Sequence, residues 1–399
     1  MEFGFSPEDE AFRQEVRAFM RANIPADLAR RSYVGGHPPL KTDVQKWQGI
    51  LHKQGWGAPH WPVEYGGMGW DPIRLHIYME ELYNADGLDY GWQGLNMVAP
   101  VIIAFGSAAQ KQRFLPRMLS GDDFWCQGFS EPNAGSDLAN LRTRAELDGD
   151  EWVINGQKIW TSDARESNWG FFLVRTDPNV KPQKGISFLL APMDTPGITI
   201  RPIESIEGGM GLNEVFLENV RVPRDNLVGE AGMGWTYAKY LLEKERTASA
   251  FLYFNKRELA KAKEIASRET IDGISLLEAP EFARKVARVE ADLNALEWSV
   301  LRILYGERTV QNNDAVVSAL KIGGSEMQQR VTALQLDALG ARALREYHGT
   351  GPEVMAGNAN WPAHIPGVAA RYLFSRASTI YGGTREVQKN IIAKLAFGL

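Results

Sequence analysis

The stretch Ser130-Glu131-Pro132-Asn133-Ala134-Gly135-Ser136-Asp137 lies where the sequence changes character. From Ser6 to about Leu119, apolar residues recur mainly at the spacing of an amphipathic helix. From about Gly121 to Gly229 the period falls to two, and β-rich runs are separated by Gly, Pro, Asn and Asp. From Gly234 to Leu399 the helical spacing returns. The order helix, strand, helix predicts an α+β fold.

The ends of these regions predict specific elements. Ser6-Pro7-Glu8-Asp9 is typical of a capped helix start, with a proline at the first helical position and acids in the first turn. The expected strands are 152–155, 171–174, 186–190, 198–203 and 215–222, and the expected long helices are 234–268, 277–309, 313–344 and 384–396. We therefore expect an α-helical domain at 1–121, an antiparallel β domain at 122–229 and a helical bundle at 230–399.

Composition limits the class of protein. The chain has 399 residues and a formal net charge of −5, so several packed domains are expected, and a mildly acidic balance does not favour binding to nucleic acid or anionic membranes. Its single cysteine, Cys126, excludes an internal disulfide, and no Cys/His cluster has zinc spacing. The acidic start Met1–Glu10 lacks the basic residues of a targeting peptide, so we expect a cytoplasmic protein.

Two segments of the β region have residues suited to binding a ligand. A turn dense in Gly, Ser, Asn and Asp, such as 130–137, can direct backbone N–H groups and hydroxyls at an anionic or carbonyl-rich ligand. Composition alone favours the other interpretation, a tight surface turn. Trp160-Thr161-Ser162 combines an indole with two hydroxyls, which can stack on a planar ring and bond its polar edge. The alternative is an ordinary packed strand.

Together and in order, these segments resemble the acyl-CoA dehydrogenase family over nearly the whole chain. The matching segments are Pro62-Val63-Glu64-Tyr65-Gly66-Gly67, Gln110-Lys111-Gln112-Arg113-Phe114-Leu115-Pro116, Ser130–Asp137, Asn155-Gly156-Gln157-Lys158-Ile159-Trp160-Thr161-Ser162 and Asn219-Val220-Arg221-Val222-Pro223. The resemblance implies a helical domain, a middle β domain and a C-terminal four-helix bundle. It also implies α,β-dehydrogenation of an acyl-CoA thioester with FAD as cofactor, the kind of step that opens a round of β-oxidation.

The resemblance also implies roles for individual residues. Gln127, Phe129, Ser130, Gly135 and Ser136 would lie along the isoalloxazine, with Trp160, Thr161 and Ser162 on its other side. Thr384 and Glu386 match further FAD-binding positions, and Ser136, Glu243 and Arg246 match positions near the CoA portion.

The position of the general base departs from the family's most frequent pattern. The usual Tyr-Glu-Gly-Thr motif reads Tyr381-Gly382-Gly383-Thr384 here, so the expected Glu is Gly382. A second family position, one residue before an arginine on the first bundle helix, is occupied by Glu245. On the expected helix over 234–268, Glu245 lies within an apolar stripe, which would raise its pKa toward that of a general base. The residues of that stripe, at i−4, i−3, i+3, i+4 and i+7, are Leu241, Leu242, Ala248, Ser249 and Leu252. The alternative is a solvated charge cluster. Gly382 retains the backbone N–H that the family uses to polarise the thioester carbonyl.

Two losses concern the half-site that a subunit of this family lends to its partner. The usual Arg-x-x-Phe-Gly is absent from 267–273, and Gln-x-x-Gly-Gly-x-Gly is reduced to Gln335-Leu336-Asp337-Ala338-Leu339-Gly340-Ala341. The chain is most similar to the large subunit of pimeloyl-CoA dehydrogenase and related heteromeric enzymes. We therefore expect a second, related subunit, with a homo-oligomer as the alternative, and an electron-transferring flavoprotein as electron acceptor.

Two other functions remain open at this point. Gly382 and the lost half-sites also fit a non-catalytic, flavin-poor subunit that completes its partner's site. An oxygen-reducing acyl-CoA oxidase shares the fold, although it usually has a longer chain.

Overall fold

The computed structural model describes residues 4–34, 39–89, 91–244, 250–305, 313–344 and 364–399. It divides into two compact units that do not follow chain order. The helical unit comprises Met1–Pro39, Trp70–Asp89 and Arg246–Leu399, and the sheet unit comprises Leu40–Gly69 and Tyr90–Glu245. The stretches 1–121 and 230–399 expected from the sequence are therefore each divided between the two units, and 122–229 lies in the sheet unit. Within the described residues, no helix combines the length and apolar character needed to cross a membrane.

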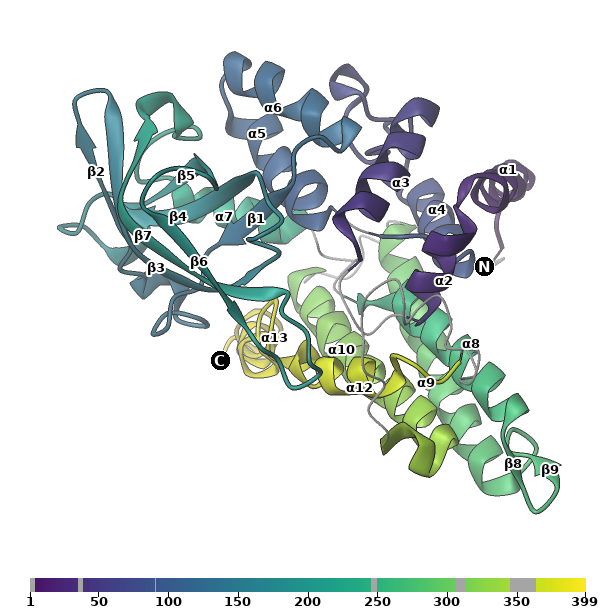
Figure 1. The fold of residues 1–399 in the computed structure, drawn as a ribbon. Helices are drawn as coiled ribbons and strands as arrows, with labels where there is room; N and C mark the ends of the chain where they lie inside the picture. Colours follow the sequence, from purple (N-terminus) through teal and green to yellow (C-terminus); the bar gives the residue numbers. More distant parts are fainter. Residues whose placement is uncertain (1–3, 35–38, 90, 245–249, 306–312, 345–363) are drawn as a thin grey trace. The chain divides into compact units, whose positions relative to one another are not determined.

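The sheet unit is built around seven strands (Figure 1). The strands are β1 (Trp125–Gly128), β2 (Arg144–Asp148), β3 (Glu151–Ser162), β4 (Trp169–Arg175), β5 (Ile186–Pro192), β6 (Ile198–Ile203) and β7 (Leu212–Pro223). Their order is β1-β4-β2-β3-β7-β6, with β5 also paired to β4. The pairing is mainly antiparallel, as expected, but β1 runs parallel to β4. Two parallel strands cannot be joined by a tight hairpin, and β2 and β3 lie between β1 and β4 in the chain.

Both faces of the central strand β4 are buried. Phe171 and Leu173 point into one apolar cluster with helices of this unit, and Phe172 and Val174 point into a second cluster with Cys126. This explains why 171–174 is apolar without alternation. The helices of the sheet unit are α3 (Lys41–Gln54), α5 (Ala99–Phe105), α6 (Ala108–Ser120) and α7 (Gly234–Lys244), with a π-helical segment at Trp92–Val98.

The cysteine is part of the second cluster. Cys126 is fully buried on β1, and its Sγ lies 3.5 Å from Sδ of Met193. Burial raises the pKa of the Cys126 thiol to about 12.

The helical unit contains α1 (Pro7–Asn23), α2 (Ala26–Val34), α4 (Pro72–Asn84), α8 (Leu252–Arg268), α9 (Pro280–Leu304), α10 (Asn313–Leu339), α12 (Val368–Ser375) and α13 (Arg385–Phe397). A short hairpin, β8 (Thr270–Ile271) with β9 (Ile274–Ser275), follows α8 (Figure 1). The predicted helix start at Ser6 is confirmed, since its Oγ accepts from Asp9 N at 3.1 Å in a capping box.

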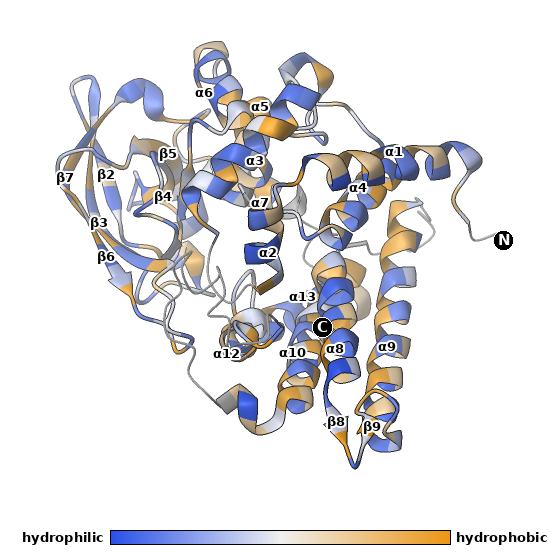
Figure 2. Ribbon diagram, turned by 45° about the vertical axis from the view of Figure 1, so that its right-hand side comes forward, coloured by the Kyte–Doolittle hydropathy of each residue, from blue (hydrophilic) through white to orange (hydrophobic). Residues whose placement is uncertain are grey.

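Helix α9 shows how sequence periodicity forms the core of the helical unit. Its buried residues recur every three or four positions, namely Phe282, Val286, Val289, Leu293, Leu296 and Val300. Figure 2 shows the resulting bands of hydrophobic and hydrophilic residues along this helix. These side chains pack in one cluster with residues of α8, α10 and α12. The amphipathic pattern thus correctly predicts a bundle helix here.

The expected helix over 234–268 is wrong as a single element. Helix α7 ends at Lys244, α8 begins at Leu252, and Phe251 between them has a left-handed backbone with φ of 50°. The backbone of Ala250 approaches α10 so closely that a Cβ on Gly324 would lie 2.0 Å from its carbonyl oxygen. A residue with a left-handed backbone cannot continue a right-handed helix, so the helical run is broken at Phe251.

Candidate functional site

The turn after β1 is joined to β3 by three hydrogen bonds. Ile159 N donates to Ser130 O at 3.0 Å. The Lys158 ammonium donates to Phe129 O at 3.2 Å and to Glu131 Oε1 at 2.8 Å. The two segments singled out from the sequence are therefore brought side by side in the sheet unit.

Glu131 closes this turn on itself. Its carboxylate accepts from Arg142 N at 2.6 Å and from Thr143 N at 2.9 Å, in addition to the bond from Lys158. Burial raises the pKa of Glu131, but the Lys158 charge and these hydrogen bonds outweigh it and hold the pKa below its ordinary value. The residues between Glu131 and Thr143 thus form a closed loop, and the Glu131 carboxylate that closes it is ionised at neutral pH.

Lys158 is fully buried beneath the loop. Burial lowers the pKa of Lys158 to about 8, with Glu131 acting in the opposite direction. At pH 7 the pair is ionised on both sides. A buried pair of this kind fixes geometry, because neither partner can move without leaving a charge unpaired.

Trp160 occupies a strained position at the edge of this arrangement. The β3–β7 register shifts between Lys158 and Thr161, and Trp160 lies in that irregularity with φ of 61°. A left-handed backbone is unfavourable for a bulky residue. The strain holds the indole outward, with 57% of its surface exposed. An exposed aromatic side chain fixed at the cost of backbone strain is typical of a binding site.

Thr161 and Ser162, which follow Trp160, are less exposed than the indole. Thr161 is fully buried, and its Oγ1 has no hydrogen-bond partner within the part of the chain that the structure describes. Its carbonyl accepts from Asn213 Nδ2 at 3.0 Å. Ser162 is half-buried and pairs with Leu212. A planar group such as an isoalloxazine fits the exposed indole, whereas the unsatisfied Thr161 hydroxyl is enclosed by the protein.

The other predicted ring contacts lie on β1 and its turn. Gln127 is half-buried on β1, and Phe129 is packed edge-to-face against Phe171 and Phe188. Gly135 and Ser136 are exposed. The Ser130–Asp137 segment is therefore a surface turn that Glu131 and Lys158 anchor from below. Its role in binding a ligand stays a prediction.

The remaining positions predicted to bind FAD or the substrate carbonyl lie in the helical unit. Gly382 and Gly383 both have left-handed backbones, with φ of 63° and 89°, and they form the turn before α13. Thr384 caps that helix, its Oγ1 accepting from Val387 N at 3.2 Å. The turn is thus fixed at both ends, and the glycines supply a conformation that a glutamate at 382 would adopt only with strain.

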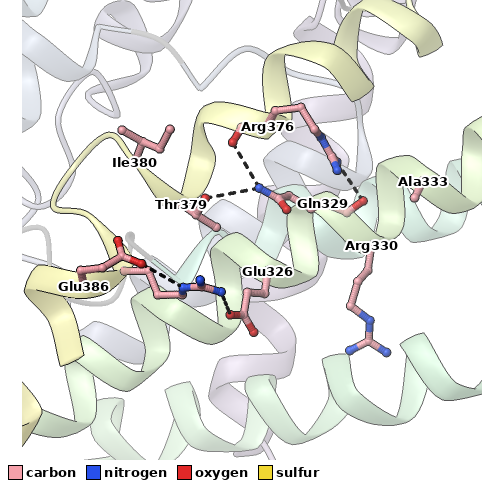
Figure 3. A pocket seen from close by; sticks show the side chains of 9 residues that line it. Glu326, Gln329, Arg330, Ala333, Arg376, Thr379, Ile380 and Glu386 are labelled. Carbon is pink, nitrogen blue, oxygen red and sulfur yellow. Dashed lines mark hydrogen bonds and ion pairs between the residues drawn. The ribbon is translucent and has the colours of Figure 1, made fainter.

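Glu386 lines a pocket of about 530 Å³ beside this turn (Figure 3). Arg385 lies between Glu386 and Glu326, with 3.4 Å to a carboxylate oxygen of each. Thr379 and Ile380 form the wall nearest the glycine turn. Both acidic and basic side chains line the pocket, and the carboxylate of Glu386 is exposed.

Three predicted residues cannot be placed. Glu245 and Arg246 lie outside the described residues, and Glu243 lies in α7 with an undescribed side chain. The interrupted helix removes the argument that Leu252 and Glu245 share one helical stripe.

One cluster of described residues has the composition of a metal site. His76, Glu80 and Glu297 offer ligand atoms within 4.8 Å of one another. The Lys256 ammonium, however, pairs with both carboxylates, at 2.6 Å to Glu297. Arg13 also pairs with Glu80, so two positive charges match the two carboxylates and the cluster is explained as an internal ion-pair network.

Gln335, the remnant of the lent half-site, points into the core. It is fully buried on α10, and its Nε2 donates to the carbonyl and to Oε2 of Glu258, both at 2.8 Å. Glu258 also pairs with Arg371 and Arg257. The amide nitrogen is thus hydrogen-bonded inside its own unit, while the buried Oε1 has no partner among the described residues. The segment 267–273 leads into the β8–β9 hairpin, whose Ile271 and Ile274 are exposed.

Sequence reasoning missed the residues that hold these segments in place. It included Lys158 only as part of a matching segment, and it did not single out Lys321, which lies beneath the glycine turn. A lysine within an apolar strand pattern was the available signal for Lys158, since a buried lysine requires a partner.

Comparison with known proteins identifies the family. Family models for the N-terminal, middle and C-terminal domains of acyl-CoA dehydrogenase match residues 6–122, 126–220 and 232–397. The chain is 36% identical over 397 residues to the acyl-CoA dehydrogenase IpdE1 of Mycobacterium tuberculosis, covering 98% of this chain and 97% of the relative.

Solved structures agree with this assignment. The ChsE4-ChsE5 complex from Mycobacterium tuberculosis is 30% identical with a TM-score of 0.84, covering 100% of this chain and 99% of that one. A structure described as the Tcur3481-Tcur3483 steroid ACAD is 29% identical with a TM-score of 0.85, at the same coverage. Members of the matched family use a flavin. This chain belongs to the acyl-CoA dehydrogenase family and is an oxidoreductase that acts on acyl-CoA.

Proposed function

We propose that this chain is the subunit of a heteromeric acyl-CoA dehydrogenase that binds the flavin ring and carries the base. The observation that supports it best is the strained, exposed Trp160 beside a turn anchored by Lys158 and Glu131. A subunit that only completed its partner's site would have no use for a binding surface that costs backbone strain.

The bound FAD would accept the β-hydrogen of the substrate together with its electron pair. Gln127, Phe129, Ser130, Gly135 and Ser136 would hold one side of the ring. Trp160, Thr161 and Ser162 would hold the other side, and Thr384 and Glu386 would contact the remainder of the cofactor.

Proton removal is assigned to Glu245. Its carboxylate would take the α-proton of the acyl group, while the backbone N–H of Gly382 polarises the thioester carbonyl and makes that proton more acidic. Ser136, Glu243 and Arg246 would bind the CoA portion. The product would be the trans-2-enoyl-CoA, and an electron-transferring flavoprotein would reoxidise the enzyme.

The need for a second subunit is supported by Gln335. Because its amide donates twice to Glu258 inside the core, it is not available to a cofactor in a neighbouring chain. The similar ChsE4-ChsE5 structure is itself a complex of two proteins. A related subunit that supplies the missing groups would complete the site.

The first experiment measures flavin per chain. We expect the chain purified alone to be colourless or to hold less than one FAD per chain. It should gain FAD when co-expressed with an acyl-CoA-dehydrogenase-like subunit encoded near it. One FAD per chain in the protein purified alone would contradict the heteromer. Absence of flavin in every combination would favour the non-catalytic subunit instead.

The second experiment tests the base. Glu245→Gln in the flavin-loaded assembly should lower the rate of flavin bleaching by an acyl-CoA panel about 10²- to 10⁴-fold. The panel should include a steroid acyl-CoA, because one of the similar structures is a steroid ACAD. Glu290→Gln, which removes an exposed carboxylate on α9, is the control and should leave the rate unchanged. Full activity of Glu245→Gln would refute the assignment, and hydrogen peroxide as the main product would indicate an oxidase.

A further inference from the structure

Lys321 lies beneath the glycine turn of the helical unit. It is 4% exposed on α10, and its ammonium donates to Ser378 O at 2.7 Å. The same ammonium lies 5.0 Å from the ring centre of Phe251 and 5.2 Å from that of Tyr381. Two aromatic faces and one carbonyl therefore hold a cation at the start of the turn.

This cation has no carboxylate partner among the described residues. Burial alone lowers the pKa of Lys321 to about 8, without an opposing contribution from an anion. The ammonium remains protonated at pH 7. Burial of an unpaired charge is costly, so its retention calls for an explanation.

Gly382 connects Lys321 to the proposed chemistry. A Cβ placed on Gly382 would lie 3.7 Å from Lys321 Cε, so the lysine stem lies directly against this residue. With no side chain at 382, nothing at that position separates the lysine from whatever binds at the backbone N–H. A carboxylate at 382, the pattern most frequent in the family, would instead be an anion beside Lys321.

We propose that Lys321 is a positioning residue that fixes the Tyr381–Gly382 turn and sets a positive potential at the thioester oxygen. This rests on the proposed function. When the α C–H bond breaks, the proton goes to Glu245 and the electron pair is shared with the thioester oxygen. A fixed cation behind the turn stabilises that anion more than the neutral substrate. At a separation of several ångströms in a protein interior, such a charge changes anion affinity by about 10- to 100-fold.

The test compares two CoA ligands of equal chain length by calorimetry on the flavin-loaded assembly. A 3-oxoacyl-CoA has an acidic α-proton and binds as its enolate, whereas an S-alkyl-CoA thioether has no carbonyl oxygen. Lys321→Gln keeps a donor for Ser378 O but removes the charge. It should lose about 10- to 100-fold in affinity for the 3-oxoacyl-CoA and less than about threefold for the thioether.

Two further variants sharpen the result. Lys321→Arg keeps the charge and should retain enolate affinity within about threefold. Lys285→Gln removes an exposed lysine of α9 that pairs with Asp337, and should change neither affinity. Equal affinities for both ligands in Lys321→Gln, with only a lower melting temperature, would overturn the proposal and leave Lys321 as a structural cap.

The wild type supplies a test of its own if Lys321→Gln does not fold. The bound 3-oxoacyl-CoA should ionise at least about one pH unit below its value in free solution, followed by the ultraviolet absorbance of the enolate. Ionisation at the free value would overturn the proposal. A wild type that binds neither ligand would refute the proposed function itself, which distinguishes that failure from a wrong role for Lys321.

Discussion

The sheet unit and the helical unit each bury one lysine beneath a proposed substrate- or cofactor-binding turn, and they treat its charge differently. Lys158 is paired with Glu131 and donates to Phe129 O as well. Lys321 has two aromatic rings and one carbonyl around it, and no carboxylate in the described part of the helical unit. Burial lowers the pKa of each to about 8.

The difference separates two uses of a buried charge. In the sheet unit both charges of the pair are satisfied internally, so the pair contributes rigidity to the turn and little net field beyond it. In the helical unit no described carboxylate compensates the positive charge of Lys321, so it acts on any anion that approaches the glycine turn. The comparison predicts that removing Lys158 lowers mainly the stability of the fold. Removing Lys321 should lower mainly the affinity for anionic ligands relative to neutral ones.

The largest expected effect is on stability in the sheet unit. Lys158→Met leaves Glu131 buried without its cation and should lower the free energy of unfolding by about 3–5 kcal/mol, measured by urea denaturation. Arg221→Met is the matched control, because Arg221 forms only exposed pairs with Asp148 and Glu151. It should cost at most about 1 kcal/mol. Equal losses in the two variants would remove the distinction between a buried and an exposed pair.

The next effect concerns pH and isolates Lys321. Its pKa is about 8 in the folded chain against 10.5 when exposed, so the unfolded state binds more protons between these values. The stability of the wild type relative to Lys321→Met should therefore rise with pH, by about 2 kcal/mol between pH 8 and 10. Lys158 is present in both proteins, so its contribution cancels. A pH-independent difference would show that the Lys321 ammonium is not buried as described.

A smaller effect is expected at the glycine turn. Gly382→Ala should cost about 1 kcal/mol in thermal unfolding, because alanine is strained at a φ of 63°. Its Cβ would be in ordinary contact with Lys321 Cε at 3.7 Å, so no clash adds to this cost. A loss well above that value would mean that the turn tolerates no side chain at all. Gly49→Ala on α3, where a Cβ meets nothing within 4 Å, is the control and should be neutral or slightly stabilising.

The smallest effect on stability is expected at Trp160. Trp160→Gly relieves a left-handed tryptophan but adds backbone freedom to the unfolded chain, so stability should change by at most about 0.5 kcal/mol. Flavin retention, measured as FAD per chain after gel filtration of the assembly, should nevertheless fall. A large loss of stability with full flavin retention would make Trp160 a structural residue.

Local sequence signals predicted a good part of this molecule. The cap at Ser6, the strands 171–174 and 198–203 and the amphipathic helix α9 follow from short-range patterns that the structure reproduces. The turn at 130–137 was also predicted, because Gly-, Ser- and Asp-rich turns are visible in the residues themselves. Trp160 was singled out as a candidate ring contact, but its exposure was not predicted.

The missed features depend on contacts between distant residues. Lys158 on β3 pairs with Glu131 in the turn after β1, 27 positions away, and Lys321 lies against Ser378 after a separation of 57 positions. The break at Phe251 lies next to the close approach of Ala250 to Gly324. No periodicity in the sequence encodes these distances, so the buried lysines and the division of 234–268 into two helices required coordinates.

The buried thiol has a practical consequence for work on a heteromeric assembly. Cys126 is the chain's single cysteine, it is fully buried against Met193, and its raised pKa leaves almost no thiolate at neutral pH. Alkylating reagents should therefore leave the native chain unmodified. Any inactivation that iodoacetamide causes in the assembled enzyme would then report on the companion protein, and a cysteine engineered onto this chain's surface would take up a label at one place.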